Sequence, residues 1–135
     1  MSDRTVAATK ARQLSLLLVQ AQGRLSDPVS RYLRRHGYRV RLATDGATAL
    51  DLLCRERINI VLLELRLPRL DGFAVLRQLH KRRQESFPYV IAVSDSASDL
   101  ERQKVRDLGA NEYLAKPLQL TRLLERIQSV EKFLC

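Results

Sequence analysis

The chain is poor in aromatic residues: only 5% of its 135 residues are Phe, Trp or Tyr, and tryptophan is absent. Its hydrophobic fraction of 45% must therefore build a core mostly from Leu, Val, Ile and Ala, which suffices for one domain of ordinary size. No stretch approaches the roughly 20 apolar residues of a membrane helix, and the N-terminus lacks the apolar stretch of a signal peptide. We expect a soluble, cytoplasmic protein without membrane contact.

Cysteine and histidine are also scarce. Cys54 lies in an apolar stretch, so we expect it to be buried, and Cys135 is the last residue. His36 and His80 are isolated from each other and from the cysteines, so no group has metal-ligand spacing. Two separate thiols fit a reducing compartment. The pattern predicts neither a disulfide framework nor a zinc site.

Charge is abundant but one-sided, with 24 Lys and Arg against 15 Asp and Glu and a net charge of +9. Such a surface attracts nucleic acid, anionic membranes and acidic proteins alike. Base-stacking aromatic residues are not interleaved with the charge, which argues against single-stranded nucleic acid. Basic residues cluster at Arg34, Arg35, Arg39 and Arg41 and at residues 81–83. We favour a solvated face for both clusters, with a nucleic-acid-binding module as the alternative.

Strand and helix signals alternate along the chain. Residues 1–12 are small and polar, and we expect a disordered lead-in there, followed by one domain over residues 13–135. Short apolar runs predict strands over residues 14–19, 38–42, 58–63, 89–93 and 113–115. Amphipathic patterns, N-cap residues and glycines predict helices from 26–28 to 37, from 45 to 55, over 73–83, from 98 to 108 and from 118 to 134.

Five such βα units predict a parallel sheet with helices on both faces. Their number and the domain length suit a flavodoxin-like (βα)5 doubly wound fold. In that fold the functional site lies at the carboxyl ends of the strands. The residues that follow Val19, Leu63, Val93 and Ala115 are therefore the ones to inspect.

Several segments share motifs with one family. Residues 59–72, which contain Glu64, Pro68 and Asp71-Gly72, and residues 109–117, which end in Lys116-Pro117, carry the most specific motifs. Residues 37–38 and 43–46 add to them. Together these segments resemble the response-regulator receiver domains of bacterial two-component signalling, over about residues 14–127.

The resemblance implies a phosphorylation pocket, and this chain departs from the family pattern there. The family has two adjacent acids after the first strand, an acceptor Asp after the third, a Ser or Thr after the fourth and a Lys after the fifth. Here Gln20 and Ala21 occupy the acid positions and Glu64 the acceptor position, whereas Ser94 and Lys116 remain. Without the acid pair we expect no Mg²⁺, no other cofactor and no enzymatic activity.

The remaining charges predict a filled pocket. We expect Glu64 and Lys116 to form an ion pair that substitutes for the phosphorylated state. Arg66 is placed by its spacing to pair with Glu64 or Asp95, and Asp95 to share Lys116. Tyr113 stands where the family has an aromatic residue that rotates on activation. With no switchable input we favour a fixed Tyr113.

The resemblance therefore implies an atypical receiver that acts by protein contact, independently of phosphorylation. In the family, the face formed by the fourth helix, fifth strand and fifth helix binds partners and self-associates, so a protein partner or a homodimer is expected. Candidate contacts there are Arg102, Lys104, Arg106, Asp107, Asn111, Glu112, Arg122 and Arg126. Residual phosphoacceptor activity through Asp71 or Asp95 remains an alternative, as does nucleic-acid binding.

Overall fold

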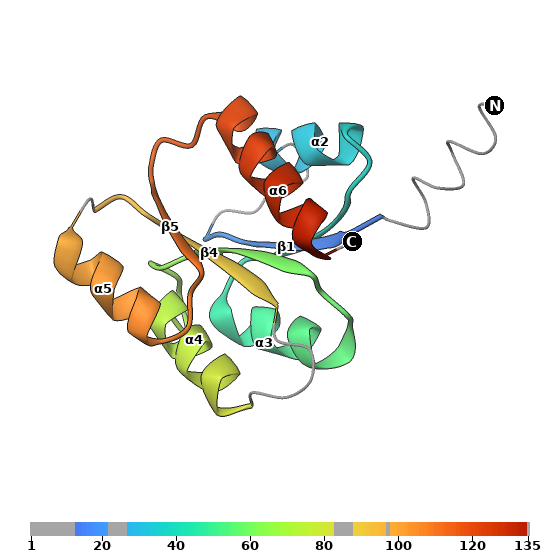
Figure 1. The fold of residues 1–135 in the computed structure, drawn as a ribbon. Helices are drawn as coiled ribbons and strands as arrows, with labels where there is room; N and C mark the ends of the chain where they lie inside the picture. Colours follow the sequence, from blue (N-terminus) through green and yellow to red (C-terminus); the bar gives the residue numbers. More distant parts are fainter. Residues whose placement is uncertain (1–12, 22–26, 83–87, 97, 135) are drawn as a thin grey trace, which may run out of the picture.

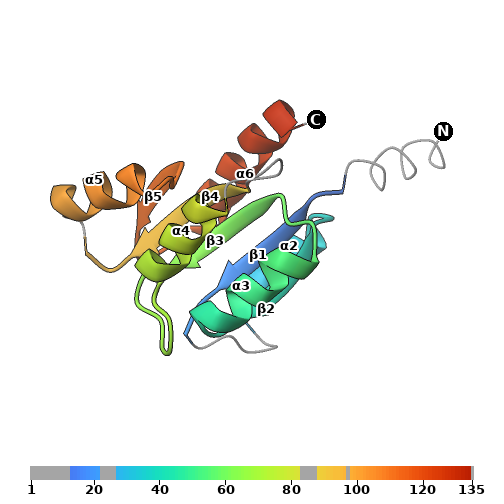
Figure 2. The same ribbon diagram turned by 90° about the horizontal axis from the view of Figure 1, so that it is seen from below.

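The computed structural model describes residues 13–21, 27–82, 88–96 and 98–134, and the expected lead-in at residues 1–12 lies outside them. Five strands form one parallel sheet in the order β2-β1-β3-β4-β5 (Figures 1 and 2). The elements are β1 (Ser15–Val19), α2 (Pro28–Arg35), β2 (Arg39–Ala43), α3 (Gly46–Arg55), β3 (Ile60–Glu64), α4 (Gly72–Lys81), β4 (Tyr89–Ser94), α5 (Asp99–Asp107), β5 (Glu112–Ala115) and α6 (Leu120–Leu134). The predicted (βα)5 flavodoxin-like fold is confirmed.

Helices cover both faces of the sheet. Figures 1 and 2 show α3, α4 and α5 on one face and α2 and α6 on the other. Successive strand residues alternate between the two cores, so that Leu17 and Val61 pack towards α3 and α4, whereas Leu16 and Ile60 pack towards α6. This double burial explains why the strand segments read as continuous apolar runs.

Helix starts are fixed by polar side chains that satisfy free backbone N–H groups. The caps are Asp27 before α2, Asp45 before α3, Asp71 before α4 and Ser98 before α5. In a parallel βα fold each helix that follows a strand begins near that strand's carboxyl end. The capping residues of these four helices therefore surround the edge of the sheet where a site is expected.

Cys54 is not buried as predicted. It lies on the exposed side of α3, and its thiol accepts a hydrogen bond from Arg82. The inner face of α3 is formed by Gly46, Ala49 and Leu52, which repeat every three residues. Cys54 is two residues, or about 200°, beyond Leu52 and so points to solvent. Its apolar neighbours in the sequence belong to the opposite side of the helix.

No helix in the described part of the chain is long and apolar enough to cross a membrane.

Candidate functional site at the carboxyl ends of the strands

Glu64 and Lys116 meet at the carboxyl edge of the sheet. The Nζ atom of Lys116 donates to Oε1 of Glu64 at 2.7 Å, which confirms the predicted ion pair. Glu64 is the last residue of β3, and its side chain is 17% exposed, against 34% for Lys116. The backbone N–H of Lys116 donates to the carbonyl of Ser94, which holds the lysine beside the neighbouring strand. The two formal charges sum to zero.

Gln20 contacts the cap of α2. Its Nε2 group donates to the carboxylate of Asp27, which also caps α2 by accepting the N–H of Val29. Ala21 is exposed and offers no polar side-chain atom. The Gln20–Asp27 contact was not predicted. The position of Asp27 as a helix cap at the carboxyl edge of the sheet is the signal that points to it.

A small pocket remains between the pair and the sheet. It has a volume of about 30 Å³ and is lined by Leu18, Val19, Gln20, Leu62, Glu64, Val93, Lys116 and Leu118. This space suits one or two water molecules. Mg²⁺ ordinarily keeps several waters and takes carboxylate ligands. The described residues include no group of three or more His, Cys, Asp and Glu side chains placed to hold a metal, and the absence of Mg²⁺ stays a prediction.

Ser94 and Asp95 differ sharply in environment. Ser94 is 1% exposed, and its hydroxyl accepts the backbone N–H of Ser96, so it shapes the loop after β4. The cap of the next helix is Ser98. Asp95 is exposed and forms no ion pair with Lys116, so the predicted sharing is wrong. Lys116 reaches Glu64 instead, at the end of β3, the strand beyond β4.

Arg66 does not enter the pocket. Its guanidinium pairs with Glu101 at 3.3 Å and its side chain is 63% exposed, so the predicted pairing with Glu64 or Asp95 is wrong. The strand ends at Glu64, and the chain then turns. The two-residue alternation on which the prediction depended therefore no longer applies at Arg66.

Tyr113 is held inside by polar contacts at its hydroxyl. The hydroxyl donates to Oε1 of Glu101 at 2.8 Å and lies against the carbonyl of Ser96, while the guanidinium of Arg102 lies 4.9 Å from the ring centre. Burial, and then the hydrogen bond to Glu101, raise the pKa of Tyr113. Glu101 thus joins Tyr113 to Arg66, a role that its position in the first turn of α5 did not reveal.

The predicted interaction face is partly engaged in contacts within the chain. Arg126 pairs with Glu112, Asn111 accepts the N–H of Val90, and Lys104 lies 4.4 Å from the ring centre of Phe73. Asp107 accepts the amide of Gln103. Within the described residues, the side chains of Arg106 and Arg122 form no hydrogen bond or ion pair. The use of this face by a partner remains a prediction.

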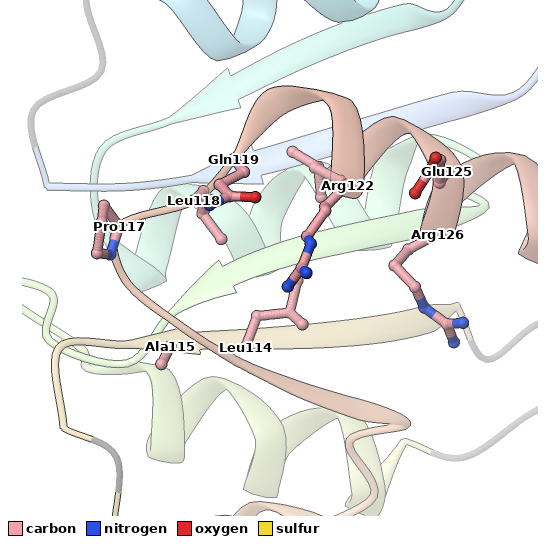
Figure 3. A pocket seen from close by; sticks show the side chains of 9 residues that line it. Leu114, Ala115, Pro117, Leu118, Gln119, Arg122, Glu125 and Arg126 are labelled. Carbon is pink, nitrogen blue, oxygen red and sulfur yellow. The ribbon is translucent and has the colours of Figure 1, made fainter.

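A groove of about 520 Å³ lies between β5 and α6 on this face. Its walls are Leu114, Ala115, Pro117, Leu118, Gln119, Arg122, Leu123, Glu125 and Arg126. Figure 3 shows Arg122 and Arg126 extending from α6 on the side where Leu114 lies. The groove is thus lined by apolar and charged side chains together, a composition typical of protein-binding surfaces.

Comparison with known proteins places this architecture in a family. The family model described as response regulator receiver domain matches residues 16–128 of this chain. The chain belongs to this family. The response regulator MprA of Mycobacterium leprae is 37% identical over 117 residues, which make up 87% of this chain and 50% of that protein. The receiver thus spans about half the length of the curated relatives it matches.

Solved structures agree on the fold. A CheY-like receiver domain from Methanospirillum hungatei has a TM-score of 0.80 with 27% identity and covers 89% of this receiver and 94% of its own chain. The receiver domain of Ssk1 from Saccharomyces cerevisiae, solved with the histidine phosphotransfer protein Ypd1, has a TM-score of 0.77 with 23% identity. That alignment covers 86% of this receiver and 87% of the other chain.

Proposed function

We propose that this receiver signals by protein contact without accepting a phosphoryl group. The observation that carries the proposal is the 2.7 Å ion pair between Lys116 and Glu64 at the end of β3, where the resemblance places the acceptor. A lysine that would offset charge on a transferring phosphoryl group is already paired with a fixed carboxylate. Glutamate also carries its carboxylate one methylene further from the backbone than the aspartate of the family pattern.

The region after β1 supports the same conclusion. An intact family pocket has three carboxylates and one ammonium group, whereas Glu64 and Lys116 leave no excess negative charge to attract Mg²⁺. Gln20 is engaged with Asp27, and Ala21 supplies no ligand. The contacts of Tyr113 with Glu101 and Ser96 favour one fixed arrangement of the neighbouring loop. The domain therefore presents a constant surface and not a switched one.

The test is an amide-fingerprint NMR titration of the 135-residue chain with Mg²⁺ and then beryllofluoride, a stand-in for an aspartyl phosphate. We expect the resonances of Glu64, Ser94 and Lys116 to stay in place at millimolar concentrations. The variant Q20D/A21D/E64D rebuilds the acidic pocket in the same fold and serves as the matched control. Its resonances should shift with both ligands.

One outcome of this titration would contradict the proposal. If the wild-type signals of Ser94, Lys116 and Tyr113 shift together, the pocket still accepts a metal and a phosphoryl mimic, and the proposal is wrong. A second measurement does not depend on the rebuilt variant. After incubation with acetyl phosphate, the intact mass of the wild-type chain should not increase by a phosphoryl group. Such an increase would support the alternative of residual acceptor activity through Asp71 or Asp95.

The surface that makes the contact is proposed to be the face of α5, β5 and α6. Its groove has an apolar and charged lining, and Arg122 contributes to that lining without a described ion-pair partner. The Ssk1 receiver, of the same fold, was solved with a protein partner. Sedimentation of wild type and R122E over a range of concentrations tests a homodimer. We expect a concentration-dependent dimer that R122E weakens, whereas a monomer at every concentration leaves a heterologous partner as the occupant.

A further inference from the structure

The most one-sided charge on the molecule lies along α2 and β2. Residues 28–43 contain five arginines and neither Asp nor Glu, so this one βα segment contributes five of the nine net positive charges. The arginines are Arg31, Arg34, Arg35, Arg39 and Arg41, and all five are exposed. The segment contains no lysine. This charge plays no part in the pocket around Glu64.

The fold brings these arginines to one margin of the sheet. Strand β2 is an edge strand, and α2 packs beside it (Figure 2). Nη2 of Arg34 donates to the carbonyl of Val40 at 2.8 Å, so this side chain of the helix reaches the open edge of the strand. Val40 packs into the core on the α2 side of the sheet, so Arg39 and Arg41 lie on the α3 side of the same edge strand, where Arg41 is in register with Leu17. The arginines therefore line this edge of the sheet from both sides. We call this set the α2–β2 arginine face.

Acidic side chains on neighbouring elements are already engaged. Glu56 pairs with Arg41 at 2.8 Å, and Glu131 accepts the hydroxyl of Tyr38 at 2.7 Å. Within the described part of the chain, no ion pair neutralises Arg31, Arg35 or Arg39. Like charges gathered along one edge of a fold raise the local potential and attract a polyanion.

We propose that the α2–β2 arginine face binds the phosphate backbone of nucleic acid. Guanidinium groups match phosphate oxygens in a bidentate geometry, which favours arginine over lysine at such contacts. Backbone phosphate binding needs no base-stacking aromatic residue and carries no sequence preference. The scarcity of aromatic residues therefore does not oppose it. This activity is separate from the protein contact proposed above and does not depend on it.

The distribution of apolar residues favours nucleic acid over an acidic protein at this face. Protein interfaces depend on large apolar or aromatic residues at their centre. In the described part of the chain the exposed large apolar residues are Leu100, Phe133 and Leu134, which lie on α5 and α6. None lies on α2 or β2. The face thus offers charge without an apolar anchor, which suits a phosphate backbone.

The experiment is fluorescence anisotropy of a labelled 20-base-pair DNA duplex with the 135-residue chain over a series of salt concentrations. Within the described residues, the four arginines of this set without an ion pair are Arg31, Arg34, Arg35 and Arg39. If all four contact phosphates, the slope of log affinity against log salt should be about −3 to −4, and the affinity should fall roughly 100-fold between about 50 and 200 mM salt. The variant R35Q/R39Q should lower the slope by about 2 units and weaken binding at least about tenfold at low salt.

The control variant R77Q/K81Q removes the same charge from the exposed side of α4, where the other basic run begins. We expect it to bind as the wild type does. Equal losses in both variants would mean that dispersed charge alone attracts DNA, and no binding at low salt would exclude the activity; either result overturns the proposal. If poly-glutamate of equal charge displaces the duplex as well as unlabelled DNA does, the face selects carboxylates, and the assignment to nucleic acid is wrong.

Discussion

Arg126 donates two hydrogen bonds to Glu112, from Nε to Oε1 at 2.9 Å and from Nη2 to Oε2 at 2.7 Å. The same carboxylate accepts the hydroxyl of Tyr89 at 2.5 Å. These contacts join the last helix to the two strands at one edge of the sheet, on the face proposed for partner binding. Bidentate charge-assisted bonds are among the stronger polar contacts in proteins.

The variant E112Q should therefore lower stability by about 1–2 kcal/mol at neutral pH. Burial raises the pKa of Glu112, but the hydrogen bonds from Arg126 and Tyr89 outweigh it and leave the pKa below its usual value of 4.5. The ionised carboxylate thus stabilises the fold above about pH 4.5, and this contribution is lost as the pH falls through the lowered pKa. Urea unfolding from neutral to acidic pH should show a smaller acid loss in E112Q. The exposed neighbour Glu125 supplies the control, E125Q, which should behave like the wild type.

The hydroxyl of Tyr89 should titrate at an unusually high pH. Burial, and then the hydrogen bond and charge of Glu112, raise its pKa to about 12 from 10.0. The neutral phenol is favoured in the fold, so its contribution to stability is complete below about pH 10 and is lost as the pH rises towards 12. A ¹³C-tyrosine NMR titration should show one resonance that moves near pH 12, absent in Y89F and shifted to lower pH in E112Q. A Tyr89 signal that titrates near pH 10 in the wild type would contradict the geometry.

The Glu64–Lys116 pair should contribute modestly to stability. A double-mutant cycle with E64Q and K116M is expected to give a coupling free energy of about 0.5–1 kcal/mol, because water screens a pair of this exposure. The pair Asp51–Arg55 on α3, whose side chains are 56% and 70% exposed, should couple more weakly in a parallel cycle. Zero coupling at Glu64–Lys116 in urea unfolding would mean that the pair does not form in solution.

Gly72 should tolerate no side chain. A Cβ atom there would lie 2.7 Å from the carbonyl oxygen of Glu64 and 2.7 Å from Cα of Leu65. Both are backbone atoms, so α4 or the end of β3 must shift, and G72A should cost about 2–3 kcal/mol in urea unfolding. The opposite change two residues later, A74G, should cost only about 0.5–1 kcal/mol. Equal stability of G72A and the wild type would show that this close approach is absent.

Sequence patterns predicted the order and type of the elements because burial on both faces of a parallel sheet leaves uninterrupted apolar runs. Polar N-caps located helix starts, as at Asp45 and Ser98. The Glu64–Lys116 pair followed from the resemblance, since two strand ends at one edge can bring distant residues together. These predictions depended on features that are local or shared by a whole fold.

The side-chain partners at the rim of the site were harder to predict. Arg66 pairs with Glu101, 35 residues away, because the chain turns after Glu64 and faces the first turn of α5. Nothing in the local pattern sets that direction. The predicted burial of Cys54 was wrong because residues that are adjacent in the sequence of a helix do not share one face. Long, exposed side chains take their positions from tertiary contacts that no short-range spacing encodes.

The hydrogen bond from Arg34 to the carbonyl of Val40 also has a protective consequence. Among the described strands, β2 is the last on its side of the sheet, and an open strand edge invites another chain to extend the sheet. Arg34 occupies one of the free carbonyls, and the charge of Arg39 repels the matching edge of a second molecule. Removing the arginines of α2 and β2 would thus leave an open template for aggregation. These arginines therefore also keep neighbouring molecules from joining their sheets edge to edge.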